Sequence, residues 1–256
     1  MLVATMPAKT PRLYVLPASH PCAAVEVALR LKSIEFKRVD LLPLQQLVVG
    51  PLRYGGATVP GMRIGTERVA GSRAIMRRLE ELEADPPLLP APDDATYASV
   101  LEAERWGDEV FQGVARRLIY AALVRRPQMM ESYAQGARLP LPIALLRPAM
   151  PLTARLAAMK SKARDENARV DLEALPGQLE RIEAWMADGV LGGERPNVAD
   201  LQIGASLRLL ASIGDVRGLI VERPAGELMR YFPPMAGEVP AGVLPAAWLA
   251  VPAASA

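Results

Sequence analysis

The first eighty residues alternate short apolar runs with longer amphipathic runs. The run Leu13-Tyr14-Val15-Leu16 has the β-branched and aromatic content of a strand. Apolar residues at helical spacing follow it after a proline. The predicted elements are strands over residues 13–16, 36–42 and 62–64, a hairpin turn over residues 65–68, and helices over residues 22–32 and 72–79. A turn-rich stretch is expected from residue 41 to residue 56. The order β-α-β followed by β-β-α predicts a small mixed sheet with helices on its faces.

The second part of the chain has a helical pattern throughout. A segment with four prolines in eight residues, 85–92, separates the two parts and is expected to be a linker. We therefore predict an α/β domain over residues 1–84 and an all-helical domain over residues 93–256. The expected helices cover residues 93–126, 171–188, with a kink or restart at Pro176, and 201–213, with a coil-rich tail from Pro233.

The last of these helices has a distinctive start and composition. Asn197 and Asp200 have the spacing of a reciprocal cap, in which each side chain accepts a backbone N–H near the start of the helix. The residues from Leu201 to Ile213 are apolar nearly all round, which is typical of a helix in the middle of a bundle.

Composition and charge exclude several classes of function. The chain has 256 residues and a formal net charge of +2, which argues against a nucleic-acid partner that needs a dense basic face. One cysteine excludes an intramolecular disulfide and fits a reducing compartment. No stretch reads as a membrane span, and residues 139–152, which come closest, carry four prolines and an arginine. For this segment a proline-rich lid or packed connector is favoured over contact with lipid. We expect a cytoplasmic protein with no metal.

The candidate chemistry begins at Ser19. This serine follows the first strand and lies just before a helix with Pro21 in its first turn. Free backbone N–H groups and the helix dipole favour an anion at such a position. A hydroxyl there can donate to a thiolate and favour its ionised form. From spacing alone, a simple capping role is the competing interpretation.

The chain resembles the cytosolic glutathione S-transferase superfamily in five features taken together. These are the strand with Ser19 after it, Val59-Pro60, residues 71–75, the proline-rich linker and the Asn197–Asp200 cap. The resemblance covers roughly residues 12–215 and implies a thioredoxin-like domain followed by a helical bundle. It also implies glutathione as a co-substrate, a small apolar electrophile as second substrate, and a homodimer.

The resemblance assigns roles to individual residues. Ser19 lies at the position where the serine or cysteine classes of the family have the residue that contacts the glutathione sulfur. Pro60 matches the family's cis proline, and the backbone of Val59 before it pairs with the tripeptide. Ser72 matches the serine that binds the γ-glutamyl carboxylate. Arg53 is a weaker candidate for the glycyl carboxylate.

Position 71 departs from the family pattern. The family usually has an acidic residue or glutamine there, where this chain has Gly71. The ligand's amino group would lose a partner, so another low-molecular-weight thiol remains an alternative.

For several other residues a purely structural interpretation competes with a functional one. Cys22 lies three residues after Ser19, and a buried structural thiol is favoured over a redox nucleophile. His20, the only histidine, is expected to be an exposed loop residue rather than a base. His20, Trp106 and Tyr120 are weak candidates for the second-substrate pocket. A solvated face is expected from four arginines, at positions 116, 117, 125 and 126.

The resulting hypothesis is thiol transfer, in which Ser19 activates glutathione for attack on an apolar electrophile. Two alternatives stay open: a non-catalytic binding module with the same fold, and a thiol-dependent redox enzyme that uses Cys22.

Overall fold

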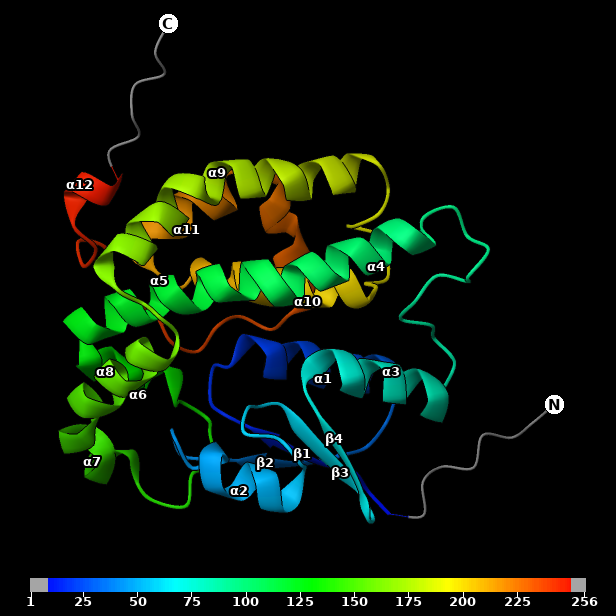
Figure 1. Cartoon of the computed structure of the whole chain (residues 1–256), viewed down its shortest axis with the longest axis horizontal. Coiled ribbons are helices and arrows are strands. Elements are labelled where there is room, and N and C mark those ends of the chain that lie inside the picture. Colours follow the sequence, from blue (N-terminus) through cyan, green and yellow to red (C-terminus); the bar gives the residue numbers. More distant parts are fainter. Residues whose placement is uncertain (1–8, 250–256) are drawn as a thin grey trace, which may run out of the picture.

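The computed structural model describes residues 9–249 and has a small sheet at one end (Figure 1). Its strands are β1 (Arg12–Val15), β2 (Lys37–Asp40), β3 (Gly61–Ile64) and β4 (Glu67–Ala70), in the order β2-β1-β3-β4. β1 pairs in parallel with β2 and antiparallel with β3, and β3 pairs antiparallel with β4. Leu13 of the central strand β1 lies opposite Arg38 on one side and Met62 on the other. The predicted mixed sheet is confirmed.

Helices cover this sheet on both sides. α1 (His20–Leu31) and α3 (Ser72–Leu82) lie between the sheet and the rest of the molecule (Figure 1). α2 (Gln46–Arg53) lies with the strands at the far side, in the stretch that we expected to be rich in turns. The expectation missed this eight-residue helix, which contains Gly50 and Pro51. The N-terminal domain has the thioredoxin-like arrangement.

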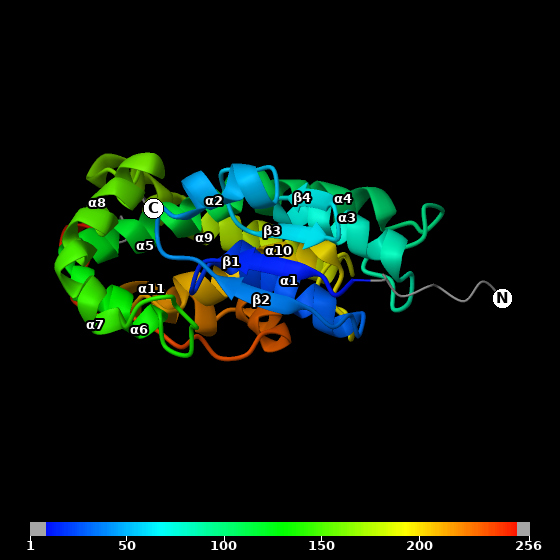
Figure 2. The same cartoon turned by 90° about the horizontal axis from the view of Figure 1, so that it is seen from below.

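The remainder of the described chain is helical. Its elements are α4 (Tyr97–Trp106), the π-helical turn η1 (Gly107–Phe111), α5 (Gln112–Arg125), η2 (Pro127–Met129), α6 (Met130–Tyr133), α7 (Ile143–Leu146), η3 (Arg147–Ala149), α8 (Met150–Lys160), α9 (Asp165–Ala187), α10 (Val198–Leu210), α11 (Gly214–Val221), η4 (Pro224–Tyr231) and α12 (Ala246–Leu249). Figures 1 and 2 show α4, η1 and α5 as one long run, with α9 and α10 beside it. The predicted all-helical region is confirmed.

α9 differs from its prediction at Pro176. The sequence predicts a kink or a restart there; the helix does not restart but runs for 23 residues through the proline. Buried Leu172, Leu175 and Leu179 on both sides of Pro176 hold the helix against its neighbours. This packing offsets the loss of one backbone hydrogen bond.

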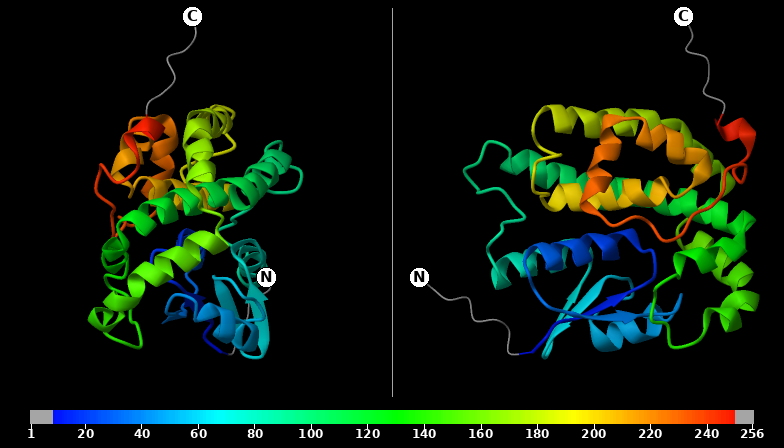
Figure 3. Two further views of the ribbon diagram at one scale, coloured as in Figure 1. Left: turned by 60° about the vertical axis from the view of Figure 1, so that its left-hand side comes forward. Right: turned by 180° about the vertical axis from the view of Figure 1, so that it is seen from behind.

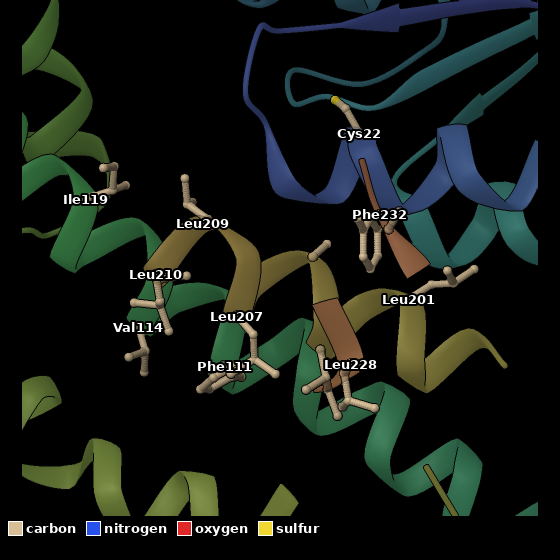
Figure 4. Packing of buried hydrophobic residues seen from close by; sticks show 14 of the residues in the cluster. Cys22, Phe111, Val114, Ile119, Leu201, Leu207, Leu209, Leu210, Leu228 and Phe232 are labelled. Carbon is tan, nitrogen blue, oxygen red and sulfur yellow. The ribbon is translucent and has the colours of Figure 1, made fainter. Parts of the chain in front are cut away.

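α10 is the central helix of the molecule. Asn197 accepts the N–H groups of Ala199 and Asp200, and Asp200 accepts the N–H of Asn197, so the predicted cap is confirmed. Twelve of its 13 residues are buried. One continuous core runs from β1 and α1 through α10 into η4, and Figure 4 shows part of it around Leu207, Leu228 and Phe232.

The connection between the two parts is anchored by a buried lysine. Residues 83–96 link α3 to α4 and contain the proline-rich segment. Lys32, 3% exposed, donates to the carbonyl oxygens of Glu83 (2.6 Å) and Pro86 (2.9 Å) and pairs with Glu80. The end of α1 therefore fixes the course of this connection.

The tail from Pro233 is mostly irregular as far as residue 245 and follows the bundle surface. Asp215 accepts the N–H groups of Gly242, Val243 and Leu244, and Ile213 and Val239 form a single β-bridge. The end of the predicted tail, residues 250–256, lies outside the described residues. Within residues 9–249, the structure contains no helix of the length and apolarity that a membrane crossing requires.

Candidate functional site

Ser19 is the N-cap residue of α1. Its side chain makes no capping hydrogen bond, although its backbone C=O accepts the Ala23 N–H at 3.0 Å. The side chain is half-buried, and the first turn of α1 carries no acidic residue. A hydroxyl that does not cap the helix is available to a ligand, and the positive end of α1 favours an anion beside it.

Ser19 also lines a cavity of about 180 Å³ between the two parts of the molecule. On the N-terminal side the walls include Cys22, Glu26 and Arg38. The opposite walls are Arg208 of α10 and the segment 233–236. The cavity brings Ser19 to the junction of the domains, as the thiol-transfer hypothesis expects.

The thiol of Cys22 is a wall of this cavity but has the properties of a structural residue. It is 1% exposed, and burial raises its pKa to about 12, more than the nearby Ser19 hydroxyl lowers it. Figure 4 shows its side chain on α1 at the edge of the core. Since the thiolate is the nucleophile, a thiol with this pKa is unreactive near neutral pH. The geometry therefore favours the structural interpretation over the redox one.

Val59 and Pro60 lie just before β3. The bond between them is cis, and the Pro60 C=O accepts the Gly71 N–H at 2.9 Å. Val59 is half-buried, and its own N–H and C=O bond no residue in the part of the chain that the structure describes. Free groups of this kind can pair with an extended peptide.

Ser72, the first residue of α3, is held by the helical domain. It is 4% exposed, and Gln202 of α10 donates from Nε2 to its Oγ at 2.9 Å. Gln202 Oε1 in turn accepts from Gln112 Nε2 at 2.9 Å, and Gln112 also donates to Asp108 and accepts from Arg116. The network joins α3, α5 and α10 across the domain boundary.

Sequence reasoning did not identify this network. Its one visible signal is a glutamine in the middle of α10, a helix in which most residues are apolar. Gln202 and Gln112 are each 1% exposed, and a buried amide needs partners.

Gly71 and Arg53 have contrasting surroundings. Gly71 has φ of 93°, and a Cβ built on it would meet nothing within 4 Å, so backbone conformation rather than crowding requires glycine. Arg53 is exposed at the end of α2. Together with Val59, Pro60 and Ser72, they lie outside the cavity that Ser19 lines. The structure therefore does not gather the predicted glutathione contacts into one cavity.

His20 is not the exposed loop residue that we expected. It is the first residue of α1 and 3% exposed, because the helical domain covers this end of the helix. Burial, together with the positive charge of Arg116, lowers its pKa well below 6.5, so the imidazole is neutral. Its Nε2 bonds no group among residues 9–249.

The two aromatic candidates differ. Trp106 stacks on Phe111 at 5.1 Å between ring centroids and meets Trp185 of α9 edge-on at 5.4 Å, so it packs, half-buried, against the core of the bundle. Burial raises the pKa of Tyr120, which lies near Arg116 on the same helix as the glutamine network.

Of the four arginines expected on a solvated face, Arg116 and Arg126 are exposed, whereas Arg117 and Arg125 are half-buried and paired with carboxylates. Arg117 pairs with Asp171, with 2.8 Å between Nη2 and Oδ1, and Arg125 pairs with Asp165 and lies over the Trp248 ring. These pairs link α5 to α9 and α12.

Within residues 9–249, the structure contains no group of three or more histidine, cysteine or acidic side chains that could hold a metal.

The comparisons with known proteins agree with this geometry. Residues 13–87 match the family model of the glutathione S-transferase N-terminal domain, which supports the glutathione S-transferase superfamily for this part of the chain. No curated protein matches the chain at a significant level.

Several solved structures have the same fold. FzlA from C. crescentus is 22% identical with a TM-score of 0.57, over 86% of this chain and 87% of that chain. A maleylacetoacetate isomerase from Anaeromyxobacter dehalogenans, with bound dicarboxyethyl glutathione and citrate, is 23% identical with a TM-score of 0.52, over 88% and 85%. A glutathione S-transferase from Rhodospirillum rubrum is 19% identical with a TM-score of 0.52, over 87% and 86%. At these identities the likeness shows the fold and nothing finer.

Proposed function

We propose that this protein is a glutathione S-transferase-like enzyme of the serine type. In this proposal Ser19 activates a thiol, glutathione in the first place, for conjugation to a small apolar electrophile. The observation that carries the proposal is the Ser19 hydroxyl: it makes no capping bond, lies at the positive end of α1 and faces the domain junction. The family match over residues 13–87 supports it.

The chemistry follows from the position of Ser19. Its O–H donates to the sulfur, and the positive end of α1 adds to the stabilisation of the anion, so the thiol loses its proton to solvent near neutral pH. The thiolate then attacks an electrophilic carbon, a C–S bond forms, and the leaving group departs with the electron pair. Val59 would pair with the peptide backbone of the thiol. Ser72 accepts from Gln202 Nε2 and donates to Gln202 Oε1 at 3.4 Å, so its hydroxyl would turn away from Oε1 to donate to a carboxylate.

The test combines binding and turnover. We expect reduced glutathione to raise the melting temperature, since a ligand at 100 times its Kd stabilises a protein by about 2.7 kcal/mol. With 1-chloro-2,4-dinitrobenzene, Ser19→Ala is expected to lose about 10²-fold in rate, as for the loss of one oriented donor. Binding of glutathione by this variant should persist.

A matched substitution guards against indirect effects. Ser99→Ala, on α4, removes a serine hydroxyl that has no place in the proposed site and should leave the rate unchanged. Conjugation by Ser19→Ala at the parental rate would show that Ser19 is not the activating group.

A non-catalytic binding module is the second candidate, and the state of Ser72 favours it. The hydroxyl expected to bind a carboxylate is buried and already bonded to Gln202. Gly71 adds no side chain for the amino group of the ligand. Under this alternative neither glutathione nor another low-molecular-weight thiol shifts the melting temperature, and no conjugation occurs.

The family resemblance also leads us to propose a cytoplasmic homodimer that acts in detoxification. Light scattering on the purified chain tests the dimer directly. A monomer at micromolar concentration would contradict it.

A further inference from the structure

α8 is apolar on both of its faces. Met150, Ala154 and Ala158 face inward, at 6%, 0% and 8% exposure, and pack toward α5. On the opposite side, Leu152, Leu156 and Met159 are exposed by 61%, 37% and 75%. Their spacing of four and then three residues places them on one line along the helix, which we call the outer stripe.

The segment that contains the outer stripe carries one sign of charge, with acidic residues only at its borders, at Glu131 and Asp165. Residues 132–164 contain six basic residues and no acidic one, in a chain whose net charge is only +2. The basic residues are Arg138, Arg147, Arg155, Lys160, Lys162 and Arg164. Among the described residues, Arg147 alone of these has a carboxylate partner, Glu131. By helical spacing, Arg155 and Lys160 flank the outer stripe on its two sides.

The arrangement of the chain leaves this face open. Figures 1 and 2 show α7 and α8 at one end of the molecule, outside α5. The left view of Figure 3, with that end turned forward, shows α8 across the front. Leu141 and Leu145, just before α8, add exposures of 46% and 68%. An exposed apolar patch rimmed by polar residues marks an interaction site.

The charge and the side-chain types decide between occupants. A two-fold contact with a second copy would place this basic face against itself, and like charges oppose such a contact. Residues 134–164 include Lys160 and Lys162, whereas lysine is depleted in protein interfaces. Leucine and methionine between lysine and arginine are instead the pattern of a helix that lies in a lipid interface.

We propose that the outer stripe and its basic rim form a docking surface for an anionic lipid bilayer. α8, about 16 Å long at 1.5 Å per residue, lies parallel to the membrane with Leu152, Leu156 and Met159 among the acyl-chain ends. Arg155, Lys160 and their basic neighbours contact the anionic headgroups. The helix does not cross the bilayer.

The experiment is sedimentation of the full chain with vesicles of phosphatidylcholine alone and of phosphatidylcholine with 30% phosphatidylglycerol. The parent protein should bind the anionic vesicles, release them as salt is raised, and not bind the neutral ones. The triple variant Leu152→Gln, Leu156→Gln, Met159→Gln should partition at least about tenfold more weakly. The double variant Arg155→Glu, Lys160→Glu should partition at least about 30-fold more weakly.

Matched variants test whether this face is responsible. Val170 and Val221 are exposed by 52% and 51% on α9 and α11, so Val170→Gln with Val221→Gln removes comparable apolar surface elsewhere and should bind vesicles like the parent. All variants change exposed side chains and should melt like the parent.

Three results would overturn the proposal. The first is that the parent protein does not bind anionic vesicles at low salt. The second is a triple or double variant that binds like the parent. The third is a triple variant whose oligomeric state, measured by light scattering, differs from the parent, which would assign the face to a second copy.

Discussion

α10 and α8 are both rich in apolar residues, yet α10 is almost fully buried and α8 is largely exposed. α10 buries 12 of its 13 residues, whereas α8 buries three of 11. α1, α4, α5 and η4 surround α10, while α8 packs along α5 and the short elements next to it. The difference shows that the position of a helix, rather than its composition, decides whether apolar surface becomes core or interface.

The polar residues of the two helices lead to the same conclusion. In α10, Gln202 bonds Ser72 and Gln112, Ser206 bonds the carbonyl of Gln202, and Arg208 donates to the carbonyls of residues 233 and 234. In α8, Arg155 and Lys160 have no carboxylate partner in the described part of the chain. In α10 the buried polar groups have hydrogen-bond partners and help to specify the fold. In α8 the unpaired charges beside exposed leucines are available to a binding partner.

The largest expected effect is a cavity in α10. Leu207 is fully buried, so Leu207→Ala should reduce the free energy of unfolding by about 3 kcal/mol, the sum of lost burial and residual cavity. Leu152→Ala in α8 makes the same chemical change on an exposed side chain and should alter it by less than about 0.5 kcal/mol. Urea denaturation measures both. Similar losses in the two variants would show that the outer stripe is packed.

The start of each helix gives a second, smaller contrast. α10 begins at a reciprocal cap, while Ala149 before α8 offers no side-chain cap. Asn197→Ala should reduce the free energy of unfolding by about 1–2 kcal/mol, because two backbone N–H groups lose their acceptor. Asn167→Ala, on the exposed side of α9, serves as the control and should have a smaller effect. Equal losses would contradict a special role for the cap.

The smallest expected effect depends on pH and concerns His20, at the buried end of α1. Its pKa is lowered in the folded state, so the unfolded chain binds more protons below pH 6.5. Its contribution to stability is therefore present above pH 6.5 and is lost as the pH falls, at about 1.4 kcal/mol per pH unit or less.

His20→Phe isolates this contribution, since the chain has no other histidine. The difference in melting temperature between parent and variant should shift in favour of the variant as the pH is lowered from 7.5 to 5.5. A difference that does not change with pH would show that His20 titrates normally in the folded protein.

Local patterns along the chain were enough to predict most of the architecture. The β-α-β and β-β-α order, the reciprocal cap at Asn197 and the burial of the following helix follow from periodicity and cap chemistry within short windows. The position of Ser19 before α1 follows from the proline in the first turn. These features depend on neighbours in sequence, so one sequence suffices.

Tertiary structure alone decided the rest. α9 continues through Pro176, because the packing of buried leucines on both sides of the proline outweighs a local penalty. His20 is buried at the start of α1, which packs on α10. Ser72 is paired with Gln202, a residue of α10 that is 130 positions away along the chain. The open outer stripe of α8 has the same kind of origin. Whether a side chain is covered depends on elements distant in sequence, and the periodicity of its own helix carries no information about them.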